Sequence, residues 1–134
     1  MATTTAKIQF MSTDLVSDTL DLSTVMTLYT SGTTTGMSKT TGLARYSTAT
    51  TSETKLLEAG DYTDSKAHKL YIKNTSTTRT DYVQITTGTI ASGSTTIGRL
   101  YGGEWGLIPW HGASDINLIQ SAVGITIEWM LFYE

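Results

Sequence analysis

The residue types of a nucleophilic hydrolase occur close together once in this chain, in the segment Trp110-His111-Gly112-Ala113-Ser114-Asp115. A catalytic triad needs a serine activated by a histidine, with a buried carboxylate to orient the histidine, and the three normally come from separate parts of a fold. Here all three lie in one short segment between two apolar stretches. Serine and aspartate side chains commonly bond to neighbouring backbone amides in turns. The segment therefore predicts a turn between strands rather than a catalytic site.

Phosphate and calcium sites require loops of defined spacing, and two loops come near to it. Residues 32–40 hold two glycines and Lys39, but only three residues separate the glycines, whereas a phosphate loop has four between its glycines and a lysine directly after the second. Asp61 and Asp64 offer oxygen ligands without the further acidic positions and the distal glutamate of a calcium loop. Both segments are predicted to be solvated loops.

Few residues in the chain could serve as metal ligands or as general acids and bases. The chain has no cysteine and two histidines, His68 and His111, so zinc–thiolate sites and thiol nucleophiles are excluded. Glu104 and Glu128 are the best candidates for a pair of catalytic carboxylates, but nothing in the neighbouring sequence marks either as an acid or a base. We expect no cofactor and no enzymatic activity.

The charge and hydropathy of the chain limit the kinds of molecule that it could bind. The 134 residues carry a net charge of −3, and only 16% are charged, which argues against the clustered lysines and arginines of a nucleic-acid-binding surface. No apolar run approaches the roughly 20 residues of a membrane span, and the first residues lack the basic-then-apolar order of a signal peptide. We expect a chain made in the cytoplasm that binds neither nucleic acid nor membrane.

The elements that must position any site are short strands. The 28 threonines favour the pleated surface of a sheet, and apolar residues fall in short blocks with alternating faces. The predicted strands are residues 7–11, 20–29, 43–46, 55–62, 68–74, 81–86, 96–100, 105–109, 115–119 and 125–132. Residues 13–21 fit a short amphipathic helix about as well as a strand, and this choice stays open.

These segments predict an all-β fold, an antiparallel β-sandwich of the jelly-roll type with threonine-rich loops and under about a tenth of its residues in helix. A single domain over residues 1–134 is expected, with residues 1–6 as a candidate flexible arm. Residues that alternate with the same phase in adjacent strands are predicted to share one core. These are Leu70, Ile72, Val83, Ile85, Leu118, Ile125 and Ile127.

Aromatic residues concentrate in residues 101–134, which hold six of the twelve. Tryptophan buries a large area while its indole N–H needs a partner, so it favours interfaces as well as cores. Trp105 and Trp129 fall inside predicted strands and are the better core candidates. Trp110 follows Pro109 at a predicted strand end, so we expect an exposed indole there that anchors a contact. The candidate interface residues are Trp110, Tyr101, Trp105, Trp129 and Tyr133.

Three stretches resemble segments of small structural proteins of tailed-bacteriophage virions. Residues 70–75 (Leu-Tyr-Ile-Lys-Asn-Thr) and 82–85 (Tyr-Val-Gln-Ile) are similar to a hairpin of those proteins. Residues 97–109 resemble their segment with a Gly-Glu turn and a following Leu-Ile-Pro, and residues 123–134 resemble their apolar final strand. The resemblance covers residues 67–134, about half of the chain.

The resemblance implies a virion protein without enzymatic activity. The leading expectation is a capsid decoration or cement protein that acts as a homo-oligomer and binds the major capsid protein or other virion proteins. The alternative is a tail, baseplate or fibre component that binds a receptor or a glycan. A small hydrolase or lyase on a jelly roll is a third reading, and it would need a metal cluster that two histidines hardly supply.

Overall fold

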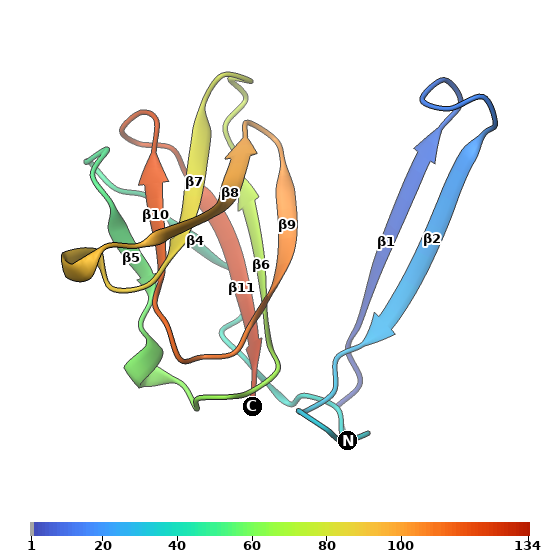
Figure 1. The fold of residues 1–134 in the computed structure, drawn as a ribbon, viewed down its shortest axis with the longest axis horizontal. Coiled ribbons are helices and arrows are strands. Elements are labelled where there is room, and N and C mark those ends of the chain that lie inside the picture. The colour runs from blue at the N-terminus through green and yellow to red at the C-terminus, as the bar shows by residue number, and fades with distance from the viewer. Residues whose placement is uncertain (1) are drawn as a thin grey trace. The chain divides into compact units, whose positions relative to one another are not determined.

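The computed structural model describes residues 2–134, which fall into two units, the first ending at Ser38 and the second spanning Lys39–Glu134 (Figure 1). The second unit contains two antiparallel sheets. Its strands are β3 (Lys39–Thr40), β4 (Ala44–Tyr46), β5 (Thr54–Leu57), β6 (His68–Asn74), β7 (Tyr82–Thr87), β8 (Thr95–Tyr101), β9 (Trp105–Trp110), β10 (Ile116–Gln120) and β11 (Ile127–Tyr133). Two short 3₁₀ turns, η1 (Ala59–Asp61) and η2 (Ile90–Ser92), lie between strands.

The strands of the second unit pair in a nested order. β7 pairs with β8, β6 with β9, β5 with β10, and β4 with β11, so each pair encloses the one before it along the chain. The resulting sheets have the orders β5-β10-β7-β8 and β3-β11-β6-β9, with β4 also paired to β11. A long antiparallel ribbon folded in this way into two facing sheets is a jelly roll. The predicted antiparallel sandwich is confirmed.

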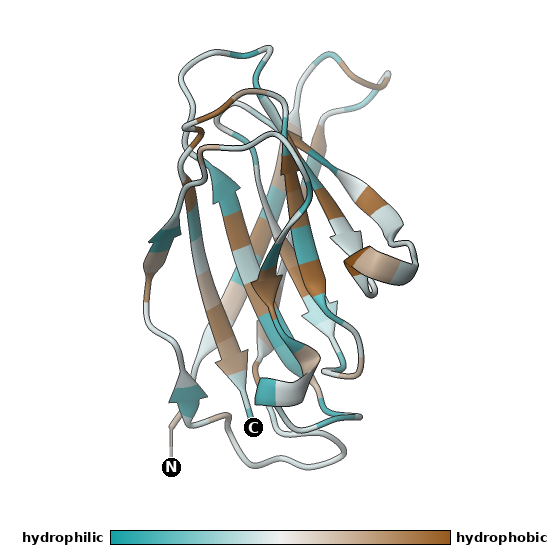
Figure 2. Ribbon diagram, turned by 90° about the vertical axis from the view of Figure 1, so that its left-hand side faces the viewer, coloured by the Kyte–Doolittle hydropathy of each residue, from teal (hydrophilic) through white to brown (hydrophobic). Residues whose placement is uncertain are grey.

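The core lies between the two sheets. All seven residues predicted to share it belong to one buried cluster, and Leu70, Ile72, Val83, Leu118 and Ile127 have no exposed surface. Apolar and polar bands alternate along the strands (Figure 2), as expected where one face of each sheet is buried and the other is not. The alternation that is visible in the sequence is therefore the alternation between core and surface.

Strand content also agrees with the prediction. Of the described residues, 49% lie in strands and 5% in helical turns. Residues 68–74 have the predicted bounds, and most other strands differ from prediction by one to three residues. Predicted strand 55–62 is shorter, because the chain leaves β5 after Leu57 and enters the 3₁₀ turn η1. Within the part of the chain that the structure describes, no helix is long and apolar enough to cross a membrane.

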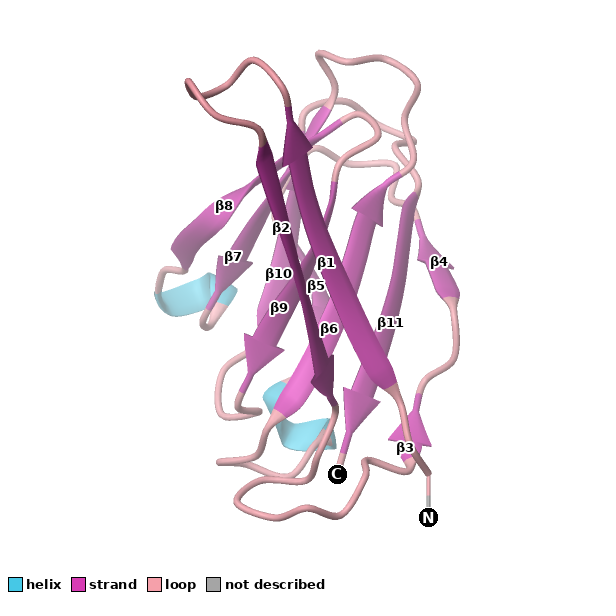
Figure 3. Ribbon diagram, turned by 90° about the vertical axis from the view of Figure 1, so that its right-hand side faces the viewer, coloured by secondary structure: helices cyan, strands magenta, loops and turns pink. Residues whose placement is uncertain are grey.

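The first unit is a two-stranded hairpin of β1 (Thr5–Ser12) and β2 (Leu20–Thr27), a long ribbon in Figure 3. Residues 13–19 form its loop, so the choice left open for residues 13–21 is resolved as loop and strand, not helix. The hydroxyl of Ser12 accepts hydrogen bonds from the amides of Asp14 and Leu15, at 3.3 and 3.0 Å, which turns the chain. Residues 5 and 6, predicted as part of an arm, belong to β1. The sandwich itself occupies residues 39–134, not the whole chain.

At the base of the hairpin, the amide of Leu28 donates to the carbonyl of Thr4 and the amide of Met37 donates to the carbonyl of Leu28, at 2.8 and 2.9 Å. Leu28 and Met37 are both buried. Tyr29 and Gly36 form an isolated antiparallel bridge, which closes the loop between them. These backbone bonds hold the loop of residues 28–37 against the start of the hairpin.

Candidate interaction surface

The segment that holds His111, Ser114 and Asp115 is a turn, as predicted. Nδ1 of His111 accepts from the amide of Ala113 at 2.9 Å, and the Ser114 carbonyl accepts from the indole of Trp110 at 2.8 Å. The Asp115 carboxylate accepts from the amide of Ala59 and pairs with Lys55 Nζ, each at 2.9 Å. The Ala59 hydrogen bond, followed by Lys55, holds the pKa of Asp115 below its ordinary value. The His111 ring and the Asp115 carboxylate therefore each have a structural partner in this arrangement.

His68 is fully buried and belongs to the end of the core. Its Nε2 lies 2.9 Å from the carbonyl oxygen of Thr63, and its ring lies 5.4 Å from that of Trp110 and 6.2 Å from that of Tyr62, centroid to centroid. Among residues 2–134, no three His, Asp or Glu side chains are grouped closely enough to hold a metal ion. The sandwich end around His68 is therefore an aromatic cluster.

Trp110 and Trp105 have the reverse of their predicted environments. Trp110 is only 5% exposed and packs against Tyr62 at 5.3 Å, whereas Trp105 is 51% exposed. The prediction ended this strand at Pro109, but β9 continues through Trp110, which therefore shares the inner face with Ile108. Proline is tolerated here because β9 is an edge strand. The expected exposed anchor at Trp110 is wrong, and so is the expected core position of Trp105.

The other candidate interface residues divide between core and surface. Trp129 and Tyr133 share the inner face of β11 with Ile127 and Leu131, and both are partly buried against the core. Tyr101, at the end of β8, is exposed, and its ring lies 5.6 Å from that of Tyr82. Tyr101 and Trp105 therefore present aromatic surface to solvent.

One apolar surface was missed by sequence reasoning, the outer face of the β3-β11-β6-β9 sheet. Its register places three rows of side chains across β11, β6 and β9. We call this set the outer sheet face: Phe132, Lys69 and Pro109; Met130, Tyr71 and Leu107; Glu128, Lys73 and Trp105. The alternation around Leu70 and Ile72 already assigns Tyr71 to the opposite face. The rest depends on pairing between strands far apart in sequence.

Tyr71 lies at the centre of the outer sheet face. Its ring lies 6.5 Å from that of Trp105, and its hydroxyl donates to Glu128 at 3.4 Å. Burial, reinforced by the nearby Glu128 carboxylate, raises the pKa of Tyr71. Burial also lowers the pKa of Lys69, whose ammonium donates to the Ala67 carbonyl at 2.7 Å. The face is thus apolar at its centre, with a lysine on either side of Tyr71 along β6.

The outer face of the other sheet is polar by comparison. Gln84 on β7 donates to the Thr96 hydroxyl at 3.1 Å and accepts from Arg99 Nε at 2.9 Å. The Arg99 guanidinium also lies over the Tyr82 ring, 4.2 Å from its centroid. Polar side chains that satisfy one another in this way are suited to solvent. The two outer faces therefore differ in chemistry, and the outer sheet face is the one suited to a protein contact.

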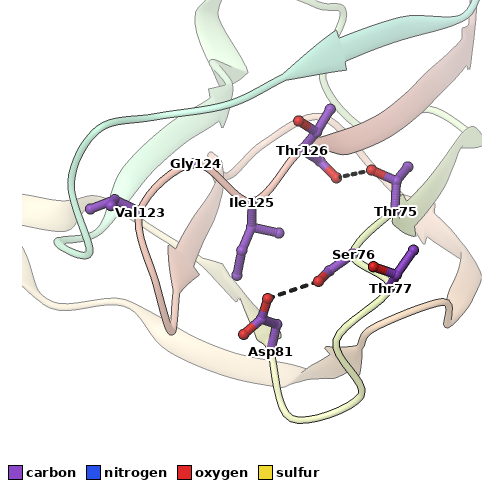
Figure 4. Close-up of a pocket in the computed structure, with 8 residues that line it drawn as sticks. All are labelled: Thr75, Ser76, Thr77, Asp81, Val123, Gly124, Ile125 and Thr126. Carbon is purple, nitrogen blue, oxygen red and sulfur yellow. Dashed lines mark hydrogen bonds between the residues drawn. The ribbon is translucent and has the colours of Figure 1, made fainter.

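The sandwich also has a shallow pocket of about 300 Å³ (Figure 4). It is lined by Thr75, Ser76, Thr77, Asp81, Val123, Gly124, Ile125 and Thr126. Thr75 donates to the Thr126 carbonyl and Ser76 donates to the Asp81 carboxylate, both at 2.7 Å. Two of the hydroxyls in the lining are therefore already engaged within the fold, and their bonds join the β6–β7 loop to the chain before β11.

Comparisons of this chain with protein-family models, with curated proteins and with solved structures found no match.

Proposed function

We propose that this chain is a structural protein of a phage virion, a capsid decoration or cement protein that binds the assembled shell as a homo-oligomer. The observation that carries the proposal is the outer sheet face, which lies on the side of the β3-β11-β6-β9 sheet away from the core. Its central row of Met130, Tyr71 and Leu107 is apolar, while the opposite sheet presents a satisfied polar network. The resemblance of residues 67–134 to phage virion proteins supports the same assignment.

The jelly roll suits this role physically. Viral capsid domains are among the proteins that use it, although a fold by itself does not assign a function. The chain has no cysteine, so its stability outside a cell rests on its core and not on disulfides. A protein that binds the assembled shell more tightly than free capsid subunits stabilises the shell by mass action.

Two measurements test the proposal. Quantitative mass spectrometry of purified particles is expected to find hundreds of copies of this chain, whereas a dozen or fewer would contradict a shell location. Purified protein added to shells that lack it should sediment with them and raise their melting temperature. Met130→Glu, on the outer sheet face, should reduce both effects at equal protein concentration, because the chain binds the shell as a homo-oligomer and a charge on this face weakens the contact between its copies. Gln84→Glu, on the polar outer face, is the matched control and should behave as wild type.

A tail, baseplate or fibre component that binds a glycan is the second candidate function. It is favoured by Trp105, whose exposed indole lies beside Tyr71, and by the presence of lectins among jelly-roll proteins. Purified protein would then bind host surface polysaccharide, and Trp105→Ala would abolish that binding. Ile97→Ala, which also removes an exposed apolar side chain from a strand, is the control. Equal binding by both variants would contradict this candidate.

A further inference from the structure

The hairpin of β1 and β2 has one apolar side and one polar side. Its register pairs Ala6 with Met26, Ile8 with Thr24, Phe10 with Leu22 and Ser12 with Leu20, and these alternate positions share one face. Six of those eight residues are apolar. The opposite side carries Thr5, Lys7, Gln9, Met11, Asp21, Ser23, Val25 and Thr27. We call the first set the apolar hairpin side.

The hairpin alone does not bury the side chains of its apolar side. Phe10 is 54% exposed and its cross-strand partner Leu22 is 53% exposed. An isolated two-stranded hairpin is marginally stable in water, and it gains independent stability when its apolar side packs on another surface. The hairpin therefore needs an apolar partner of similar dimensions.

We propose that the hairpin of one copy packs its apolar side on the outer sheet face of a second copy, and that two copies exchange hairpins in this way. The inference rests on the homo-oligomer part of the proposed function and does not depend on binding to a shell.

The hairpin unit and the outer sheet face carry opposite net charge, although Lys7 and Asp21 lie on the side of the hairpin opposite the apolar one. The hairpin unit carries Lys7 against three acidic residues, Asp14, Asp18 and Asp21. Two of these lie in the hairpin loop between β1 and β2. The outer sheet face carries Lys69 and Lys73 on either side of Tyr71, and its Glu128 is already paired with Arg45 at 4.0 Å. An acidic hairpin on a face with two lysines gains attraction and specificity.

The area favours exchange between two copies over a single contact. Two strands of eight residues cover a footprint of about 27 by 10 Å, set by the rise per residue and the spacing between strands. Since both surfaces are removed from water, one such contact buries on the order of 600 Å², below the range of stable interfaces. Reciprocal exchange doubles this to about 1,200 Å², which reaches that range. A two-fold dimer in which the same surfaces meet twice satisfies this requirement.

Sedimentation of the full chain tests the proposal with a matched pair of variants. Leu22→Glu and Val25→Glu both place a charge on β2, at residues that are 53% and 58% exposed, but on opposite sides of the hairpin. Wild type should be a dimer. Leu22→Glu should raise the dimer dissociation constant by about 30-fold or more, the scale of an interface hot spot, and Val25→Glu should change it by less than about threefold.

A further variant alters the other surface of the proposed interface, the outer sheet face. Leu107→Glu alters the outer sheet face without touching the hairpin and should dissociate the dimer as Leu22→Glu does. Circular dichroism and denaturant titration of each variant report whether the sandwich is still folded. A wild-type monomer, or equal effects of Leu22→Glu and Val25→Glu, would overturn the proposal.

Cross-linking distinguishes exchange between copies from packing within one copy. Because the chain has no cysteine, Phe10→Cys in a tagged copy and Leu107→Cys in an untagged copy can be mixed and oxidised. A disulfide-linked heterodimer is expected, at a yield several-fold above a mixture in which Gln9→Cys replaces Phe10→Cys. A disulfide that forms only within one chain, in the Phe10→Cys and Leu107→Cys double variant, would overturn the exchange. Shell binding measured on the same proteins tests the proposed function separately. A monomer that still stabilises shells overturns this inference and the homo-oligomer part of the proposed function, whereas a dimer that does not bind shells overturns the shell-binding part alone.

Discussion

Trp105 and Trp110 are the first and last residues of β9, and their side chains lie on opposite faces of the sheet. Trp110 packs against Tyr62 and donates its indole N–H to the Ser114 carbonyl, while Trp105 lies beside Tyr71 on the outer sheet face. Six residues of one edge strand therefore join the aromatic end of the core to the candidate interaction surface.

The two tryptophans should respond differently to truncation. Trp110→Ala leaves a cavity among Tyr62 and His68 and removes the donor to Ser114, so the free energy of unfolding should fall by about 3–5 kcal/mol. Trp105→Ala should lower it by less than about 1 kcal/mol, because its indole is half exposed. Urea titrations followed by circular dichroism measure both. Equal losses would contradict the assigned faces of β9.

The core position of Ile72 can be tested against a residue of the same type at the surface. Ile72 has no exposed surface, whereas Ile97 on β8 is 48% exposed. Ile72→Ala should cost about 2–5 kcal/mol. Ile97→Ala removes the same atoms from an edge strand and should cost less than about 1 kcal/mol. Thermal and denaturant unfolding would show a wrong register for β6 if the order of the two losses were reversed.

Gly102 is required for close approach between two loops. A Cβ at this position would collide with the carbonyl oxygen of Thr78, with the Ser76 carbonyl oxygen only 2.9 Å away. Gly102→Ala should therefore lower the free energy of unfolding by about 1–3 kcal/mol, as overpacking does. At Gly106 on β9, an added Cβ would meet no atom within 4 Å, and Gly106→Ala should leave stability unchanged or slightly increased. Comparable midpoints for the two variants in urea would refute this account.

Asp115 should make the free energy of unfolding depend on pH. The Ala59 amide and the Lys55 ammonium hold the pKa of Asp115 below its ordinary value of 3.8. Since folding lowers this pKa, the ionised carboxylate stabilises the fold above about pH 4, and that contribution is lost as the pH falls through the folded-state pKa. Asp115→Asn keeps an acceptor for Ala59 but loses the charge, so it should cost about 1 kcal/mol at pH 7.

The pH dependence separates the charge from the size of the side chain. The difference in unfolding free energy between wild type and Asp115→Asn should shrink as the pH falls from about 5 to about 2. Urea titrations at a series of pH values measure it. A difference that stays constant over this range would show that the carboxylate's charge contributes nothing to the fold.

The sequence was sufficient for the fold class and the core because both follow from local alternation. Leu70 and Ile72 alternate with Lys69, Tyr71 and Lys73, and this pattern alone separates the inner face of β6 from the outer one. The two-residue strand β3 has no such pattern, because two residues cannot show a period. It is defined by its pairing with Phe132 and Tyr133, which lie far along the chain near its other end.

The candidate surface was less accessible from sequence, for two physical reasons. The row of Met130, Tyr71 and Leu107 depends on the register between three strands, which tertiary pairing sets and no local pattern reports. The faces of Trp105 and Trp110 depend on whether β9 ends at Pro109 or one residue later. A proline usually marks such an end, but an edge strand has one side without ladder bonds and can continue through it.

The nested pairing of the jelly roll also dictates an order of events as the chain is made. The β7–β8 ribbon joins residues close in sequence and can form as soon as it has been synthesised, whereas β4 must wait for β11, which comes last of all the strands. Each outer pair closes a longer loop than the one inside it, and folds dominated by such distant pairs form slowly, over milliseconds to seconds. Until β11 is in place, β6 lacks its neighbour on one side, and the apolar residues it will cover remain open to other chains.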